Sequence, residues 1–127
     1  MESVKKRVYK NLLQAFEKSL SISSSPEAFM NLVLETETFS KLIEASEKNE
    51  QIWIEKMKNQ LKENLAVGKP LRYEWFREKK FGNKRLFYLI NESTQKAILI
   101  AFGTKKEQQK IIAHILINKE RYLKQIA

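Results

Sequence analysis

The segment Val67-Gly68-Lys69-Pro70 constrains the fold most, because it divides the sequence into a helical part and a part rich in strands. Glycine readily adopts the left-handed conformation that ends a helix, and proline cannot continue one. Before this break, apolar residues at helical spacing predict a helix over 50–65, and Thr36 or Thr38 can cap a preceding helix that runs to about Lys48. The two helices form a hairpin that must bury its apolar stripe on another layer.

The part of the sequence after the break supplies that layer. Gly82-Asn83 is a turn signal, and the short apolar runs around it are typical of strands. We predict three strands, at residues 71–78, 85–90 and 96–102. Their short connections favour an antiparallel meander. A strand at Phe29–Leu34 and a helix from Lys106 to the end complete an α+β domain, in which a small antiparallel sheet packs on the helical hairpin.

An extra N-terminal helix is predicted before this domain. Apolar residues recur at helical spacing over residues 4–20, and Ser21–Pro26 then breaks the pattern. We therefore divide the chain into a helical extension with a serine-rich joint, residues 1–25, and a main domain, residues 26–127. The extra helix is expected to pack on the hairpin, because its own basic residues would be repelled by the basic half of the protein.

Composition excludes several classes of protein. The chain has no cysteine and one histidine, His114, so disulfides, thiolate metal sites and a Ser-His-Asp triad are not expected, and we predict no metal and no cofactor. We interpret His114 as a structural residue of the C-terminal helix. No apolar run approaches the roughly 20 residues that span a bilayer. The N-terminus lacks the apolar stretch of a secretory signal, so we expect a cytoplasmic protein without a membrane partner.

Positive charge is concentrated in one half of the sequence. Residues 1–68 hold ten Lys/Arg and ten Asp/Glu, whereas residues 69–127 hold fourteen Lys/Arg and five Glu, which accounts for the whole net charge of +9. Such an asymmetry favours a surface that binds phosphates or an acidic partner.

Several of these cations converge on one end of the predicted sheet. Arg77 and Lys79 share a face because strand side chains alternate, and Arg85 opens the next strand, where it can lie near them. Lys105 and Lys106 follow the third strand. The phosphates of a bent RNA would neutralise such a cluster. Lysine can serve in acid–base catalysis, and arginine, which stays charged, suits the clamping of a phosphate.

Neighbouring residues are candidates for binding RNA rather than for its chemistry. Tyr73 and Trp75 could stack on bases, although one face of their strand must belong to the core. Trp53 is expected in the core of the hairpin, and Tyr88 is expected to be packed. The RNA-binding candidates are Lys80, Lys84, Lys106, Arg72 and Tyr73.

Three short motifs lie where the predicted elements of the main domain meet. Gly68-Lys-Pro-Leu71 links the second helix to the sheet, Arg77 precedes Phe81-Gly-Asn-Lys-Arg-Leu-Phe-Tyr88, and Ala101-Phe-Gly-Thr-Lys-Lys-Glu-Gln108 leaves the third strand. With these motifs and this order of elements, residues 29–127 resemble the RelE/ParE/HigB superfamily of toxins from toxin–antitoxin pairs. The resemblance implies the RelE-like fold with an added N-terminal helix.

The resemblance also implies an activity, which is metal-independent cleavage of mRNA on the ribosome, and an acidic antitoxin as partner. Arg85 matches a family arginine at the scissile phosphate, Arg77 and Lys79 match basic residues of the preceding strand, and Lys105 matches a basic residue after the third strand. RelE has a C-terminal tyrosine where this sequence has Ile111. A dimer or a toxin–antitoxin hetero-oligomer would be compatible with this family.

Two other functions remain open for the same fold. One is ParE-like inhibition of DNA gyrase without catalysis, for which the cation cluster is not needed. The other is binding of nucleic acid or antitoxin by a protein that has lost catalysis, which the missing tyrosine favours.

Overall fold

The computed structural model describes residues 30–127, which form one compact unit from Asn31 to the C-terminus. The predicted extension and joint, residues 1–25, and the start of the predicted strand at Phe29 lie outside the described residues. The division of the chain at residue 25 therefore remains a prediction.

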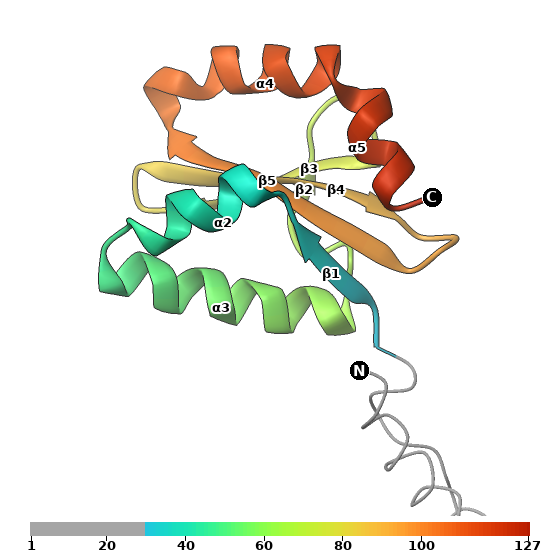
Figure 1. Cartoon of the computed structure of the whole chain (residues 1–127), viewed down its shortest axis with the longest axis horizontal. Helices are drawn as coiled ribbons and strands as arrows, with labels where there is room; N and C mark the ends of the chain where they lie inside the picture. Colours follow the sequence, from blue (N-terminus) through green and yellow to red (C-terminus); the bar gives the residue numbers. More distant parts are fainter. Residues whose placement is uncertain (1–29) are drawn as a thin grey trace, which may run out of the picture. The chain divides into compact units, whose positions relative to one another are not determined.

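The described part contains a five-stranded sheet with the strand order β1-β5-β4-β3-β2 (Figure 1). Strands β3, β4 and β5 are neighbours and antiparallel, which confirms the predicted meander. Strand β1 runs parallel to β5, and the chain between them contains the two helices of the hairpin and the other three strands. The strands are β1 (Leu32–Glu35), β2 (Lys69–Pro70), β3 (Phe76–Phe81), β4 (Lys84–Asn91) and β5 (Lys96–Thr104).

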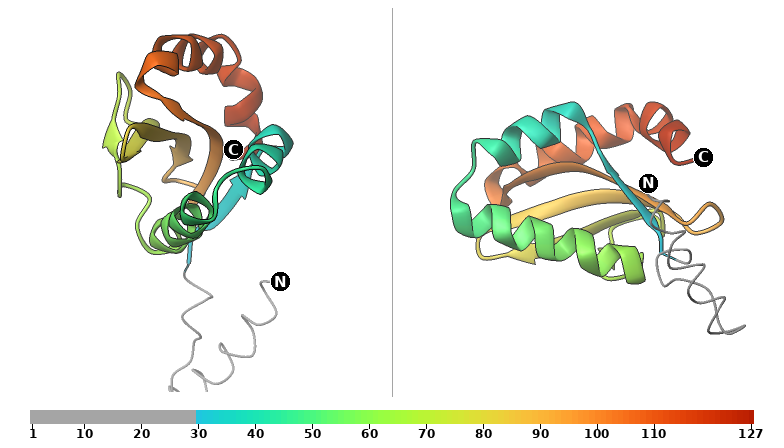
Figure 2. Two further views of the ribbon diagram at one scale, coloured as in Figure 1. Left: turned by 90° about the vertical axis from the view of Figure 1, so that its left-hand side faces the viewer. Right: turned by 60° about the horizontal axis from the view of Figure 1, so that its bottom comes forward.

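Helices cover both faces of the sheet (Figures 1 and 2). The predicted hairpin of α2 and α3 lies on one face, and α4 and α5 lie on the other. The predicted C-terminal helix is divided at Asn118, whose side-chain amide and backbone N–H both donate to the His114 carbonyl. The helices are α2 (Glu37–Glu44), α3 (Lys48–Glu63), the short 3-10 helix η2 (Lys105–Glu107), α4 (Gln108–Ile117) and α5 (Lys119–Gln125).

Two apolar layers hold the helices on the sheet. Alternation along β4 sends Leu86 and Tyr88 toward the hairpin and Phe87 and Leu89 toward α4 and α5. All four side chains are fully buried, which explains why β4 is a continuous apolar run rather than an alternating one. The hairpin contributes Phe39, Ile54, Met57 and Leu61 to its layer, and the C-terminal helices contribute Ile115, Tyr122 and Ile126 to theirs.

Local sequence explains where the hairpin begins and where one strand prediction is wrong. Thr36 caps α2, because its hydroxyl accepts a hydrogen bond of 3.0 Å from the Phe39 N–H. The strand predicted at 71–78 begins only at Phe76. The preceding residues 71–75 make a turn between β2 and β3, closed by a 2.8 Å bond from the Leu71 N–H to the Phe76 carbonyl.

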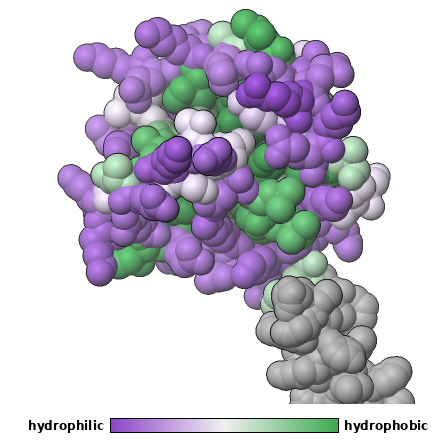
Figure 3. Space-filling model, in the orientation of Figure 1, coloured by the Kyte–Doolittle hydropathy of each residue, from purple (hydrophilic) through white to green (hydrophobic). Residues whose placement is uncertain are grey.

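The surface of the described part is mostly hydrophilic in the view of Figure 3, with smaller hydrophobic areas between the hydrophilic residues. Apolar residues on part of a protein surface are ordinary. Among the described residues, no helix is both long and apolar enough to cross a membrane.

Candidate functional site

The cross-strand register decides which of the predicted cations share a face. Arg77 pairs with Tyr88, and Lys80 pairs with Arg85. Paired residues of an antiparallel ladder point to the same face of the sheet. Arg85 therefore lies on the face covered by α4, with Lys80, while Arg77 and Lys79 lie on the hairpin face. Arg77 and Lys79 therefore do not share a face with Arg85, because Arg85 pairs with Lys80 rather than with either of them.

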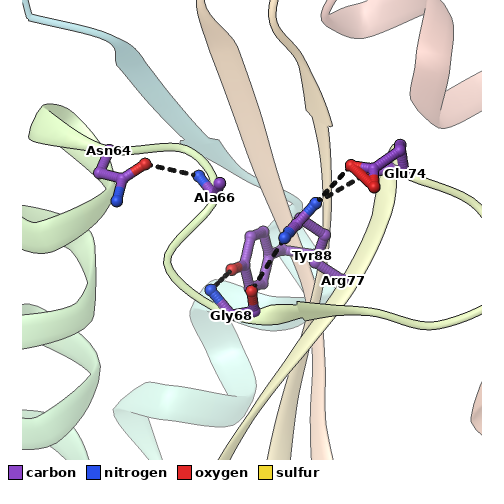
Figure 4. A network of polar contacts seen from close by, with 6 residues as sticks. All are labelled: Asn64, Ala66, Gly68, Glu74, Arg77 and Tyr88. Carbon is purple, nitrogen blue, oxygen red and sulfur yellow. Dashed lines mark hydrogen bonds and ion pairs between the residues drawn. The ribbon is translucent and has the colours of Figure 1, made fainter.

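Arg77 is a buried structural residue, and its side chain is 7% exposed. Its guanidinium donates to the Gly68 carbonyl at 3.0 Å and to the carbonyl and carboxylate of Glu74 at 3.1 Å each (Figure 4). These bonds attach Gly68 and Glu74, two points in the segment between α3 and β3, to the sheet. The arginine that the sequence assigns to catalysis therefore has both terminal amino groups engaged with the protein itself, while its buried Nε has no hydrogen-bond partner within the described residues.

Tyr88 completes the same network. Its hydroxyl accepts a hydrogen bond of 2.7 Å from the Gly68 N–H (Figure 4). Burial raises the pKa of Tyr88 above its ordinary value, although the Gly68 N–H and the charge of Arg77 act in the opposite direction. A side chain at position 68 would collide with the Glu78 carbonyl and the Tyr88 hydroxyl, so this site requires glycine. The prediction that Tyr88 is packed is confirmed.

The face of Arg85 carries a carboxylate that the sequence analysis did not select. Glu78 pairs with Lys69 and lies two residues from Lys80, so all three share this face with Arg85. The Glu78 carboxylate lies 3.4 Å from Arg85 Nε and 3.9 Å from Lys69 Nζ. Its side chain is 5% exposed and that of Arg85 is 13% exposed, so the pair is mostly shielded from water.

A hollow opens beside this pair at the edge of the sheet. Its volume is about 340 Å³, and it is lined by Val67, Gly68, Lys69, Glu78, Lys79 and Lys80. The three lysines place positive charge around a space that is open to solvent. Such a space can admit an anionic group next to the Arg85–Glu78 pair.

Lys84 is separated from this site. Its ammonium lies 2.8 Å from a carboxylate oxygen of Glu50 on α3 and 5.3 Å from the centre of the Phe102 ring. Lys84 therefore belongs to the hairpin face and is neutralised there. Lys79 shares that face but is partly exposed.

Lys105 and Lys106 lie in η2, directly after β5, and both are exposed. They follow Gly103, which pairs with Arg85. A Cβ at position 103 would lie 2.6 Å from Ile111 Cδ1, so glycine allows α4 to approach the sheet beside Arg85. The double lysine is therefore close to the Arg85 face in the fold.

Glu107 fixes the start of this basic turn. Its carboxylate accepts hydrogen bonds from the Thr104 N–H at 2.8 Å and from the Thr104 hydroxyl at 3.1 Å. The backbone bond, then the hydroxyl bond, hold the pKa of Glu107 below its ordinary value. The charged carboxylate thus remains in place as a cap of η2 at neutral pH.

The aromatic candidates separate into surface and core. Tyr73 is 44% exposed and stacks on Trp75 with the ring centres 4.8 Å apart. Trp75 is partly buried in the α4–α5 layer, and Trp53 packs on the hairpin layer as predicted. Arg72 is exposed beside Tyr73 in the turn. Tyr73 is therefore the more exposed member of the stacked pair, and it follows the exposed Arg72 in the chain.

His114 is exposed on α4 and hydrogen bonded on both sides of its ring. Its Nε2 lies 3.1 Å from the Tyr122 hydroxyl and its Nδ1 lies 3.3 Å from the Asn118 amide. It lines a groove of about 760 Å³ between α2 and the C-terminal helices, whose other lining residues include Phe39 and Lys110. The side-chain hydrogen bonds of His114 thus join α4 to Asn118 and to Tyr122 of α5.

Comparison with known proteins identifies the fold. No protein-family model and no curated protein matches the chain significantly. A chain of the crystal structure of the toxin–antitoxin complex RelBE2 from Mycobacterium tuberculosis is similar, with a TM-score of 0.51 and 22% identity, over 60% of this chain and 99% of that chain. The isolated RelE toxin of E. coli has a TM-score of 0.52 and 14% identity, over 67% of this chain and 98% of that chain.

These likenesses show that the chain has a RelE-like fold. The predicted fold class is confirmed, with a mixed α/β architecture and a five-stranded sheet. The structural resemblance to the RelE superfamily that the sequence motifs indicated is confirmed at the level of the fold.

Proposed function

We propose that this protein is the toxin of a toxin–antitoxin pair and that it cleaves mRNA on the ribosome in the cytoplasm. The observation that carries the proposal is the basic face of the sheet, on which Arg85, Lys80 and Lys69 gather next to the exposed Lys105 and Lys106. Both similar structures are named as a toxin or a toxin–antitoxin complex, which supports the same reading of the fold.

The proposed chemistry is attack of an RNA 2′-hydroxyl on the adjacent phosphate. This step needs a base for the hydroxyl, positive charge for the pentavalent phosphate and an acid for the leaving 5′-oxygen. In our proposal Arg85 stabilises the phosphate, and Lys80 and Lys105 are the candidates for proton transfer. They replace the set that included Arg77 and Lys79, because those two side chains lie on the other face.

Residues around this centre are proposed to bind the RNA strand. Lys69 and Lys106 present exposed ammonium groups for phosphates, and Arg72 does so from the turn before β3. The exposed ring of Tyr73 is proposed to stack on a base. Lys84 is omitted from the RNA-binding set, because its charge is paired with Glu50.

The proposed partner is an acidic antitoxin. The net charge of +9 attracts nucleic acid nonspecifically when the basic surface is uncovered. An acidic segment of the antitoxin bound over Arg85 and the double lysine would prevent RNA from binding there. The similar chain from M. tuberculosis belongs to a complex of toxin and antitoxin.

A second candidate is a binding protein of the same fold without catalysis. Two observations favour this candidate. Ile111, which stands where RelE has a tyrosine in its C-terminal segment, lies next to Gly103 and so beside Arg85. Glu78 also offsets part of the positive charge of this face. An aliphatic side chain can transfer no proton.

Induced expression in bacteria separates the candidates. The proposal predicts arrested growth and new mRNA 5′ ends within translated codons, detected by primer extension. Arrest with intact mRNA and gyrase-dependent DNA breaks would support a ParE-like inhibitor instead. Tight RNA or antitoxin binding without arrest or cleavage would support the binding protein.

A further inference from the structure

We propose that Glu78 is a positioning residue that orients Arg85 toward the phosphate of the RNA. The inference rests on the proposed function, and it assigns a role to the carboxylate that forms an ion pair with Arg85 on this face of the sheet. Arg85 would touch the RNA, and Glu78 would act through Arg85.

The geometry of the pair supports this role. Glu78 Oε1 lies 3.4 Å from Nε of Arg85, which is the inner nitrogen of the guanidinium. Both atoms are inaccessible to solvent and make no hydrogen bond within the described part of the chain, whereas the terminal amino groups of Arg85 are not among such buried atoms. The ion pair therefore holds the inner edge of the guanidinium and leaves the outer fork for a ligand, in the geometry that suits a phosphate.

The surrounding charges explain why Arg85 needs this support. Lys80 is its direct cross-strand partner, and like charges in that position repel each other. Arginine also has many rotamers, so an unrestrained side chain would spend much of its time turned away from Lys80. Glu78 lies diagonally across the ladder and attracts Arg85 back over the sheet. Lys69, at 3.9 Å and exposed, shares the same carboxylate from the other side.

Stability alone does not account for a buried pair of this kind. Shielding two charges from water costs free energy, and apolar residues of similar size often serve stability as well or better. Without the Glu78 carboxylate, the positive charge of this face would also attract a phosphate more strongly. The presence of Glu78 is explained if the orientation of Arg85 matters more than the total charge.

The first test is an NMR measurement on the wild-type chain made by cell-free synthesis. The Nε–H signal of Arg85, assigned by its loss in Arg85→Lys, should exchange with water at least about tenfold more slowly than that of the exposed Arg121. Glu78→Gln should remove this protection, whereas the control Glu50→Gln, which removes a carboxylate from the Lys84 pair on the other face, should not. Equal exchange of Arg85 and Arg121 in the wild type would overturn the inference, whether or not the protein cleaves RNA.

The second test is single-turnover cleavage of mRNA on ribosomes, with folding checked by thermal unfolding. Glu78→Gln should slow cleavage at saturating protein on the order of tenfold without weakening RNA affinity, because a misplaced group affects the reacting geometry first. In an Arg85→Lys background, which has no Nε for Glu78 to hold, the same substitution should have no further effect. An equal slowing in that background, or no slowing in the wild type, would refute the positioning role. Absence of wild-type cleavage would refute the proposed function, and the NMR test would still decide the inference.

Discussion

Replacement of Arg77 by methionine should lower the free energy of unfolding rather than remove a catalytic group. Methionine retains most of the aliphatic stem of arginine and has no donors. The substitution removes the bonds to the Gly68 carbonyl and to the Glu74 carbonyl and carboxylate. It therefore releases the segment between α3 and β3 at both of its anchored ends.

The expected loss of stability follows from the partners of these bonds. A hydrogen bond from a charged donor contributes about 1.5–3 kcal/mol, and an orphaned buried acceptor costs a similar amount. The Glu74 carboxylate is mostly exposed, so its bond contributes little, and relief of the shielded charge of Arg77 offsets part of the cost. We therefore expect a loss of about 2–3 kcal/mol in the free energy of unfolding. For a domain of this size that corresponds to a decrease of roughly 8–24 °C in Tm.

Urea unfolding followed by circular dichroism measures this loss, and mRNA cleavage is assayed well below the lowered Tm. Lys79→Met is the matched control, because Lys79 lies on the same strand and face but is partly exposed, and it should change stability by less than about 0.5 kcal/mol. Arg77→Met should retain cleavage per folded molecule. If Arg77→Met is as stable as the wild type yet inactive, Arg77 is a functional residue and the structural role argued here is wrong.

Four further results are expected. Lys80→Ala should reduce cleavage on the order of tenfold or more, while Lys84→Ala, which removes the same charge from the other face, should leave the rate of the folded protein unchanged; equal losses would contradict the face assignment. Burial would raise the pKa of Glu35, but bonds from Lys58 and Ser40 and the Lys58 charge outweigh it and lower the pKa, so the stabilisation present at neutral pH should be lost as pH falls below about 4.5 and should be absent in Glu35→Gln by urea titration. The pKa of Tyr88 is raised instead, so its contribution to the free energy of unfolding should be lost only as pH rises above 10.0. Tyr88→Phe should therefore lose less stability at alkaline pH than the wild type. Removal of residues 1–25 should lower Tm but spare cleavage, as expected from the sequence of the extension; unchanged Tm with lost activity would place the extension in the functional surface.

Most of the fold could be predicted from the sequence, because its helices and strands have different hydrophobic periods. The Gly68–Pro70 break and the Gly82-Asn83 turn divide the chain where the structure does, and Gly82 has the positive φ of 62° that such a turn requires. The prediction of a strand at 71–78 is wrong for residues 71–75. Their aromatic residues fit a strand pattern, but the chain turns there, and Arg77 donates a hydrogen bond to the Gly68 carbonyl. Tyr73 and Trp75 stack within that turn.

The candidate site was harder to predict, because it depends on register. Side-chain alternation correctly places Arg77 and Lys79 together, but the choice of partner across the turn decides which face Arg85 shares. A two-residue turn at Gly82-Asn83 pairs Phe81 with Lys84 and hence Lys80 with Arg85, so the sequence contained this signal. Glu78 could not be predicted, because one carboxylate in a strand rich in lysine and arginine carries no sequence signal for a phosphate-binding face.

Cleavage of a defined mRNA on purified ribosomes by the wild type and by Arg85→Ala shows whether the Arg85 face carries the reaction. We expect new 5′ ends within translated codons with the wild type and a rate about 10²–10³-fold lower with Arg85→Ala, the loss that follows removal of one donor to a transition-state charge. Circular dichroism should show that both proteins are folded. Cleavage by folded Arg85→Ala at the wild-type rate would contradict the assignment of the reaction to the Arg85 face.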